Sequence, residues 1–188
     1  MPHYLIFGDS ITFGQSDPNG GWVHLLQEHL YANDYIYNLG INSDTTEGVL
    51  SRFETELKPR LSSIESNVII FALGVNDSTV ITEEKYKANL IQLITLARKY
   101  TEQIILVSPA PIYLEKFNPA DWIPEIIFKP DLVKKFSEAV KEVAEAENLK
   151  FVDLFNQLPQ EYIKTLDDGV HPNTAGHRMI FDLVKTKL

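Results

Sequence analysis

The sequence predicts an α/β fold, a three-layer α/β/α sandwich built around a five-stranded parallel sheet. Five short apolar runs recur along the chain, and segments with helical periodicity separate them. Strands that alternate with helices are typical of βαβ units and a mostly parallel sheet. Both faces of such a sheet are covered, which explains why the runs are continuously apolar.

The expected strands are rich in β-branched and aromatic residues and end near Gly, Pro or Ser. In chain order they are residues 4–7, 35–39, 68–73, 104–107 and 151–154. These runs are far shorter than the roughly 20 apolar residues that a membrane-spanning helix needs. We therefore expect no stable insertion into a membrane.

The expected helices lie between and after these runs, at residues 22–30, 82–100, 131–146 and from 174 onward. In the second of them, Tyr86, Leu90 and Ile94 share one face. Thr82 is a suitable N-cap for that helix and Asn173 for the last, because their side-chain oxygens can accept from free N–H groups. The sequence therefore predicts strands and helices that alternate along the chain.

Length and composition predict a single domain spanning residues 1–188, with 44% apolar and 23% charged residues. Acidic residues outnumber basic ones by 26 to 17, and a net charge of −9 repels nucleic acid and anionic lipid. Cysteine is absent from the sequence, which excludes thiolate chemistry. The first residues lack the features of a signal peptide, so we expect a cytoplasmic protein.

The segment from Pro109 to Pro130 interrupts the pattern. It contains five prolines and several aromatic residues, which is too long and too apolar for a plain connection. One interpretation is that its aromatic side chains wall an acyl or leaving-group pocket. The other is that they pack on the body of the protein or on a second subunit, which leaves a homo-oligomer open.

Ligands of an open parallel sheet bind beyond the carboxyl ends of the strands, so the residues that follow each strand matter most. Four short blocks occupy such positions or the C-terminal region. They read GDS at 8–10, NLG at 38–40, GVND at 74–77 and DGVHP at 168–172. Each has an ordinary explanation as a turn or helix cap when taken alone. Their convergence on one rim would be difficult to explain in that way.

With these four blocks in this order, the sequence resembles the SGNH hydrolases, also called GDSL-type esterases and lipases. The resemblance spans residues 8–172, with Ile11 where the name motif has Leu. It implies a flavodoxin-like fold and carboxylic ester hydrolysis without a cofactor. Ser10 would be the nucleophile, His171 its base and Asp168 the residue that orients His171. The backbone N–H groups of Ser10 and Gly40 and the side chain of Asn76 would form the oxyanion hole.

The expected reaction proceeds through an acyl-enzyme on Ser10. The expected substrates are short-chain acyl or acetyl esters of small soluble alcohols or carbohydrates, or lysophospholipids. A thioesterase or an acyl transferase would use the same triad, so these activities remain alternatives. A non-catalytic small-molecule binding domain is a further alternative, which predicts that Ser10, Asp168 and His171 lie apart or act as caps.

Several residues near these blocks have a simpler interpretation. Asp167 rivals Asp168 by proximity alone, and Asp9 is expected to shape the loop of the nucleophile. His177 is expected to be a packed structural histidine. The sequence has no pair of histidines at metal-ligand spacing and no Gly-rich phosphate loop, so neither a metal nor a nucleotide is expected.

Overall fold

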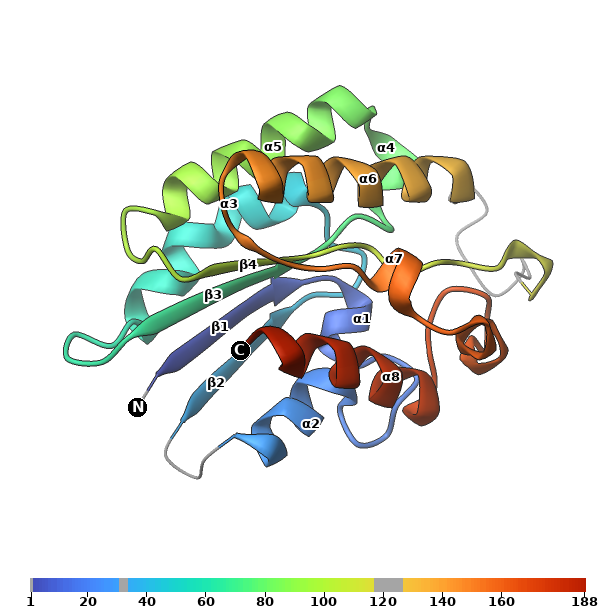
Figure 1. Cartoon of the computed structure of the whole chain (residues 1–188), viewed down its shortest axis with the longest axis horizontal. Helices are drawn as coiled ribbons and strands as arrows, with labels where there is room; N and C mark the ends of the chain where they lie inside the picture. Colours follow the sequence, from blue (N-terminus) through green and yellow to red (C-terminus); the bar gives the residue numbers. More distant parts are fainter. Residues whose placement is uncertain (1, 31–33, 117–126) are drawn as a thin grey trace.

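The computed structural model describes residues 2–30, 34–116 and 127–188, and its centre is a parallel β-sheet (Figure 1). The strands are β1 (His3–Gly8), β2 (Tyr35–Gly40), β3 (Asn67–Ala72), β4 (Ile104–Val107) and β5 (Lys150–Val152). Their order in the sheet is β2-β1-β3-β4-β5. This confirms the predicted five-stranded parallel sheet.

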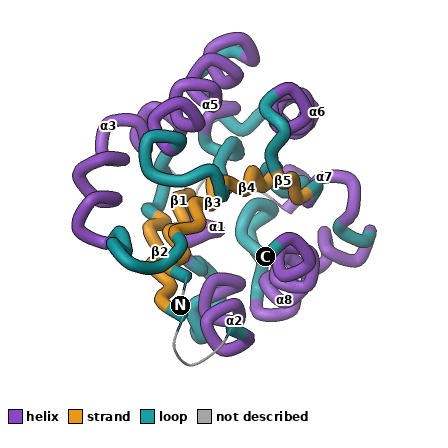
Figure 2. Tube along the Cα trace, turned by 60° about the vertical axis from the view of Figure 1, so that its left-hand side comes forward, coloured by secondary structure: helices purple, strands orange, loops and turns teal. Residues whose placement is uncertain are grey.

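Helices cover both faces of the sheet, as the end-on view in Figure 2 shows. On one face lie α3 (Thr46–Leu57), α5 (Glu83–Ala97) and α6 (Pro130–Ala146). On the other lie α2 (Gly21–His29) and α8 (Thr174–Val184). Two separate hydrophobic clusters fill the two interfaces between sheet and helices. The predicted three-layer α/β/α sandwich is therefore confirmed.

Strand β1 shows how one run of sequence serves both clusters. Its Leu5 and Phe7 belong to the cluster under α3, α5 and α6, and its Tyr4 and Ile6 belong to the cluster under α2 and α8. Successive strand residues point to opposite faces, so a strand buried on both sides must be apolar at every position. At its end, Gly8 pairs with Gly40 of β2 and Ala72 of β3. The carboxyl ends of β2, β1 and β3 are thus level with one another.

The expected helices agree with α2, α5, α6 and α8, but helix α3 was not among them. Its inner residues Val49, Phe53 and Leu57 follow a spacing of four, which is helical, and Thr45 caps it by accepting from the Gly48 N–H. The remaining short helices are α1 (Ser10–Phe13), α4 (Asp77–Val80) and α7 (Leu154–Gln157). Short 3₁₀ turns follow at Lys58–Arg60, Leu114–Lys116, Gln160–Thr165 and Lys185–Lys187.

The predicted last strand was two residues too long at its end. Residue 154 was expected in a strand, whereas Leu154 is the first residue of α7. Asp153 explains the early end, because its carboxylate accepts from the Asn156 N–H and so caps a helix in place of a strand.

The segment from Pro109 to Pro130 falls partly outside the described residues, since 117–126 are among those not described. Of its described part, Phe128 is buried in the cluster under α2 and α8, and Ile127 is exposed. The Tyr113 N–H donates to the carbonyl of Gly169, two residues before His171, at 2.8 Å. Whether the segment walls a pocket or forms an interface stays a prediction.

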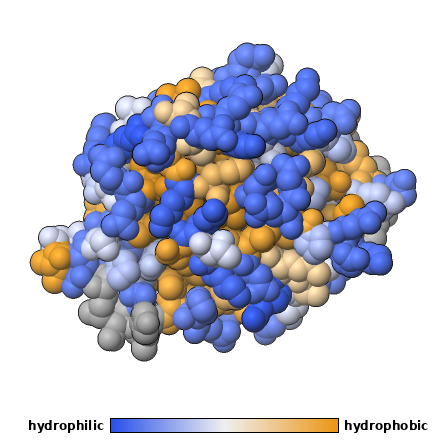
Figure 3. Space-filling view, in the orientation of Figure 1, coloured by the Kyte–Doolittle hydropathy of each residue, from blue (hydrophilic) through white to orange (hydrophobic). Residues whose placement is uncertain are grey.

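The surface carries mostly hydrophilic side chains over the outer helices, with hydrophobic ones showing between them in the space-filling view (Figure 3). Among the helices within the described ranges, none combines the length and the apolar character that crossing a bilayer requires.

Candidate active site

Ser10 lies at the end of β1, where the chain turns from strand into helix. It is the first residue of α1, and Asp9 caps that helix by accepting from the Ile11 N–H at 3.0 Å. The first N–H groups of a helix have no acceptor within the helix, so the Ser10 N–H points outward from it. The turn thereby presents both the hydroxyl and the N–H of one serine.

Three side chains form a continuous chain of hydrogen bonds. The Oγ of Ser10 lies 2.8 Å from Nε2 of His171, and Nδ1 of His171 lies 2.6 Å from Oδ2 of Asp168. The second carboxylate oxygen, Oδ1, accepts from the N–H groups of Val170 at 2.9 Å and His171 at 2.7 Å. These distances fit a histidine that donates from Nδ1 to Asp168 and accepts the hydroxyl proton of Ser10 at Nε2.

The electrostatics favour that arrangement. Partial burial opposes ionisation of Asp168, but hydrogen bonds from the His171 ring and backbone outweigh it and hold the pKa below its usual range. Asp168 is therefore ionised at neutral pH. Ser10 and His171 are buried, so a positive charge on the imidazole would have a fixed carboxylate beside it.

Backbone contacts join the two ends of the loop that carries Asp168 and His171. Leu166 and Pro172 form a β-bridge, and the Asp167 N–H donates to the His171 carbonyl at 3.2 Å. This bond engages only the backbone of Asp167, and Asp167 is an exposed residue. The carboxylate on the His171 ring is that of Asp168, whereas the rival Asp167 contributes to the loop through its backbone.

Of the three groups expected in the oxyanion hole, Gly40 is not a free donor. Its N–H donates to Oδ1 of Asn38 at 3.0 Å, and Asn38 in turn donates to the Thr12 carbonyl at 3.0 Å. The bond to Asn38 engages the donor that the resemblance assigns to the oxyanion hole, and that role of Gly40 stays a prediction. Its lack of a side chain has another reason: a Cβ would lie 2.4 Å from the Phe13 N and 2.9 Å from the Asp9 carbonyl oxygen.

Asn76 lies at the end of the loop after β3, directly before α4. Its Nδ2 donates to the Asp44 carbonyl at 3.0 Å, across the gap between two loops. A side-chain amide carries two donor hydrogens, so this bond fixes the amide and leaves its second hydrogen for another acceptor. That hydrogen is available to an acceptor outside these two loops.

A buried polar network holds the same two loops together. The fully buried carboxylate of Asp77 accepts from the Thr46 N–H at 3.0 Å and from its hydroxyl at 2.5 Å. Asn89 of α5 donates to the same hydroxyl at 2.8 Å. Burial raises the pKa of Asp77 to about 6, although the bonds from Thr46 oppose that rise. Sequence reasoning missed this role, and its only signal was the Asp that follows Asn76 in the third block.

Asp9 is buried beside Ser10, and this burial changes the pKa of its carboxyl group. Burial raises its pKa from 3.8 to about 7, against the effects of the Ile11 N–H and of His171. Between about pH 4 and pH 7 the folded protein keeps a proton that the unfolded chain has released. The contribution of Asp9 to stability is therefore complete below pH 4 and is lost as the pH rises to 7.

Replacing Asp9 by Asn removes this titration while keeping an oxygen for the Ile11 N–H. The unaltered protein should lose stability relative to Asp9→Asn as the pH rises from 5 to 8. Over that range the difference between their free energies of unfolding should shift by up to about 3 kcal/mol in favour of the variant. Urea unfolding at both pH values measures it. Asp77 titrates in both proteins, so it enters the difference only through its weaker charge coupling to Asp9. Asp167→Asn, at an exposed site, is the control, and a difference for Asp9→Asn that does not change with pH would contradict the prediction.

His177 packs inside the fold. Its Nδ1 accepts from the Trp22 N–H at 3.4 Å, and its Nε2 lies 3.0 Å from the Gln15 carbonyl, to which it donates. Burial lowers its pKa, which favours the neutral ring that this pattern needs. The ring ties α8 to the loop after α1 and so supports the segment that carries Ser10.

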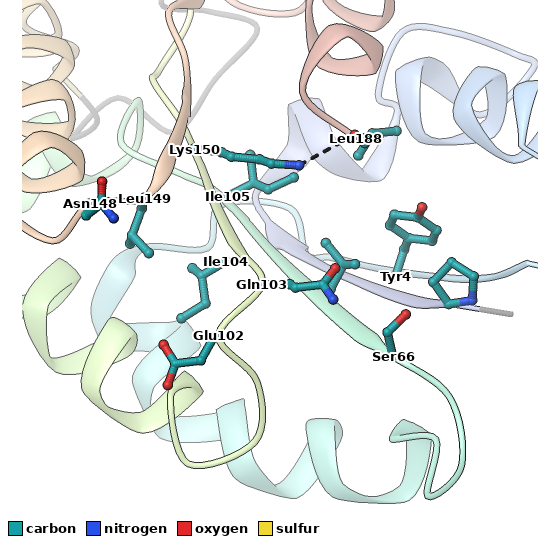
Figure 4. A pocket seen from close by; sticks show the side chains of 12 residues that line it. Tyr4, Ser66, Glu102, Gln103, Ile104, Ile105, Asn148, Leu149, Lys150 and Leu188 are labelled. Carbon is teal, nitrogen blue, oxygen red and sulfur yellow. Dashed lines mark hydrogen bonds between the residues drawn. The ribbon is translucent and has the colours of Figure 1, made fainter.

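Cavities among the described residues differ in size and place, and one of about 430 Å³ is lined by Tyr113, Gln160, Glu161, Ile163 and Lys164. One of about 20 Å³ is lined by Asp9, Thr12 and Ser108 among others, which is room for about one water. One of about 360 Å³ lies at the amino ends of β1, β3, β4 and β5, where Tyr4 and Lys150 help to line it (Figure 4). Parallel strands run from that end toward Ser10, so this cavity of about 360 Å³ lies at the end of the sheet opposite Ser10. Within the described residues, no group of three or more His, Asp or Glu side chains is arranged to hold a metal.

A family model and the relatives of this chain point to the same protein family. The family model of the GDSL-like lipase/acylhydrolase family matches residues 6–179. The GDSL esterase/lipase CPRD49 of Arabidopsis thaliana is 26% identical over 199 residues, covering 95% of this chain and 75% of that protein. The probable rhamnogalacturonan acetylesterase YesY of Bacillus subtilis is 27% identical over 165 residues, covering 82% of this chain and 71% of that protein.

Solved structures agree with these relatives. The crystal structure of a lipase/acylhydrolase from Enterococcus faecalis has a TM-score of 0.81 and 25% identity, covering 98% of this chain and 93% of that one. The match of the family model spans all four blocks that carry the resemblance. The chain belongs to the GDSL-like lipase/acylhydrolase family and is an ester-hydrolysing enzyme.

Proposed function

We propose that the protein hydrolyses carboxylic esters of short acyl groups, acetyl above all, through an acyl-enzyme on Ser10. The observation that carries this proposal is the hydrogen-bond chain from Ser10 through His171 to Asp168, with distances of 2.8 and 2.6 Å. A serine hydroxyl is a weak nucleophile until an adjacent base takes its proton. The non-catalytic alternative expected these side chains to lie apart, and their contact disfavours it.

In the first half of the reaction, Oγ of Ser10 attacks the ester carbonyl carbon while its proton passes to Nε2 of His171. The carbonyl oxygen becomes an oxyanion, which the Ser10 N–H and the free hydrogen of the Asn76 amide stabilise. His171 then gives the proton to the leaving alkoxy oxygen as the bond between carbon and that oxygen breaks. The products are a free alcohol and an ester of Ser10.

In the second half, water takes the place of Ser10 as nucleophile. His171 accepts a proton from the water as it attacks the acyl carbon, and the second tetrahedral intermediate uses the same donors. The proton returns from His171 to Oγ as the acyl–oxygen bond breaks and the carboxylic acid leaves. Asp168 stays ionised throughout and balances the charge of the imidazolium.

The substrate class rests on three observations. A relative at 27% identity is named as a probable rhamnogalacturonan acetylesterase. The net charge of −9 disfavours anionic lipid surfaces. The exposed apolar side chains of Phe13 and Ile41 follow Ser10 and Gly40 closely in the sequence, so they are suited to contact a small uncharged substrate. We therefore favour acetyl esters of small alcohols or carbohydrates over lysophospholipids.

The test joins a covalent probe to a substrate panel. A fluorophosphonate, which forms a bond from phosphorus to Oγ with loss of fluoride, should label the protein once, at Ser10, as peptide mass spectrometry will show. Acetyl, butyryl, octanoyl and palmitoyl esters, each with a thioester counterpart, then rank acyl length and leaving group. Labelling of another residue would overturn the mechanism, and a preference for long acyl chains or thioesters would overturn the substrate class.

A further inference from the structure

Arg52 of α3 donates three hydrogen bonds to the end of β2 and to the loop that follows it. Its Nε and Nη2 donate to Oδ2 of Asp44 at 2.9 and 2.7 Å, and Nη2 also donates to the Leu39 carbonyl at 2.8 Å. Its Nη1 donates to Glu56 at 2.9 Å. The side chains of Arg52 and Asp44 are only 14% and 10% exposed, so water screens this pair less than a surface pair.

The two loop contacts lie at the two ends of the same loop. Leu39 is next to the end of β2, and Asp44 lies just before Thr45, the N-cap of α3. The carbonyl of Leu39 and the N–H of Gly40 belong to one peptide group, so Arg52 also fixes the plane of that group. One guanidinium thus holds both ends of residues 39–44.

Asp44 connects this loop to the third block. Its side chain binds Arg52, while its backbone carbonyl accepts from Nδ2 of Asn76 at 3.0 Å. Moving Asp44 therefore turns the Asn76 amide and redirects its second hydrogen. An oxyanion donor acts through preorganised geometry, and a misplacement of about 1 Å can cost about 100-fold in rate.

We propose that Arg52 is a positioning residue for the oxyanion hole, which acts by holding Asp44 so that Asp44 orients the amide of Asn76. This inference rests on the proposed function, in which Asn76 stabilises the oxyanion. Arg52 touches none of the reacting atoms in this scheme. Its effect belongs to the transition state, because the oxyanion exists there and not in the bound ester.

The local sequence suits an arginine in this place. A planar guanidinium presents several donors in a fixed fork, whereas a lysine ammonium is a single point charge. Arg52 also stacks over Phe7, with its central carbon 5.5 Å from the ring centroid. Gly48 leaves room for the carboxylate, since a Cβ there would lie 1.8 Å from Oδ1 of Asp44.

The test compares Arg52→Lys and Arg52→Gln with Glu56→Gln as the matched control. Glu56→Gln removes the charge of the one partner of Arg52 that lies along α3, away from the loop. We expect kcat for an acetyl ester to fall about 10- to 100-fold in both Arg52 variants, with KM changed less than about threefold. Glu56→Gln should stay within about twofold of the unaltered enzyme in kcat.

Two further measurements separate positioning from a general loss of structure. Affinity for phenylboronic acid, which forms a tetrahedral adduct on Oγ, should fall in parallel with kcat in the Arg52 variants. The pH dependence of kcat/KM should not shift, because Ser10, His171 and Asp168 are untouched. A kcat within about threefold of normal, an equal loss in Glu56→Gln, or an unchanged boronate affinity overturns the proposal. Failure of the proposed function shows separately, as fluorophosphonate labelling away from Ser10.

Discussion

Replacing Ser10 by alanine should lower kcat/KM for an acetyl ester by about 10⁴-fold or more, because no acyl-enzyme can form without Oγ. The remaining donors still bind the carbonyl oxygen, so a small residual rate above that in water is expected. The lost hydroxyl is small and makes one described hydrogen bond, to His171. The midpoint of thermal unfolding should therefore change little, and steady-state kinetics beside a melting curve test both statements.

Ser108 provides the control for this change. It is also a buried serine, after β4, and it lines the small cavity beside Asp9. Its hydroxyl bonds the Pro109 carbonyl and the Phe155 N–H instead of a histidine. Ser108→Ala should keep activity within about tenfold of normal and lose stability, since it leaves the partly buried Phe155 N–H without its partner. Near-normal activity of Ser10→Ala would refute the nucleophile assignment.

Sequence predicted the sheet well because buried parallel strands have a local signature. Apolar residues at every position, as in residues 68–73, occur where both faces are covered, and no distant contact is needed to see them. The first three blocks lie at the ends of these strands, whereas the fourth, at 168–172, lies farther along the chain. Helix α3 was missed because its apolar residues Val49, Phe53 and Leu57 are diluted by polar ones that face solvent.

The parts of the site that sequence could not predict depend on contacts between loops. The bond from Asn76 to Asp44 and the bonds from Arg52 to Leu39 and Asp44 join residues with no common spacing rule. The expectation for Gly40 illustrates the same limit. The resemblance assigns the Gly40 N–H to the oxyanion hole; its bond to Asn38 and the close packing of its Cα against α1 come from contacts that no sequence motif states.

Replacing Asp168 by asparagine should lower kcat by about 10⁴-fold, the second largest effect that we expect. An asparagine amide placed against Nδ1 of His171 favours the wrong tautomer, in which Nε2 carries the proton and cannot accept from Ser10. It also removes the charge that stabilises the imidazolium. Because the substrate does not touch Asp168 in the proposed mechanism, KM should change far less than kcat.

Asp167→Asn is the matched control, since it makes the same chemical change one residue away. The backbone of Asp167 bonds His171, and an asparagine leaves that bond intact. It should keep kcat within about threefold of normal. If Asp167→Asn and Asp168→Asn lost equal activity, the effect would come from the charge of the loop as a whole. A loss confined to Asp168→Asn instead assigns it to the one carboxylate that lies 2.6 Å from the imidazole.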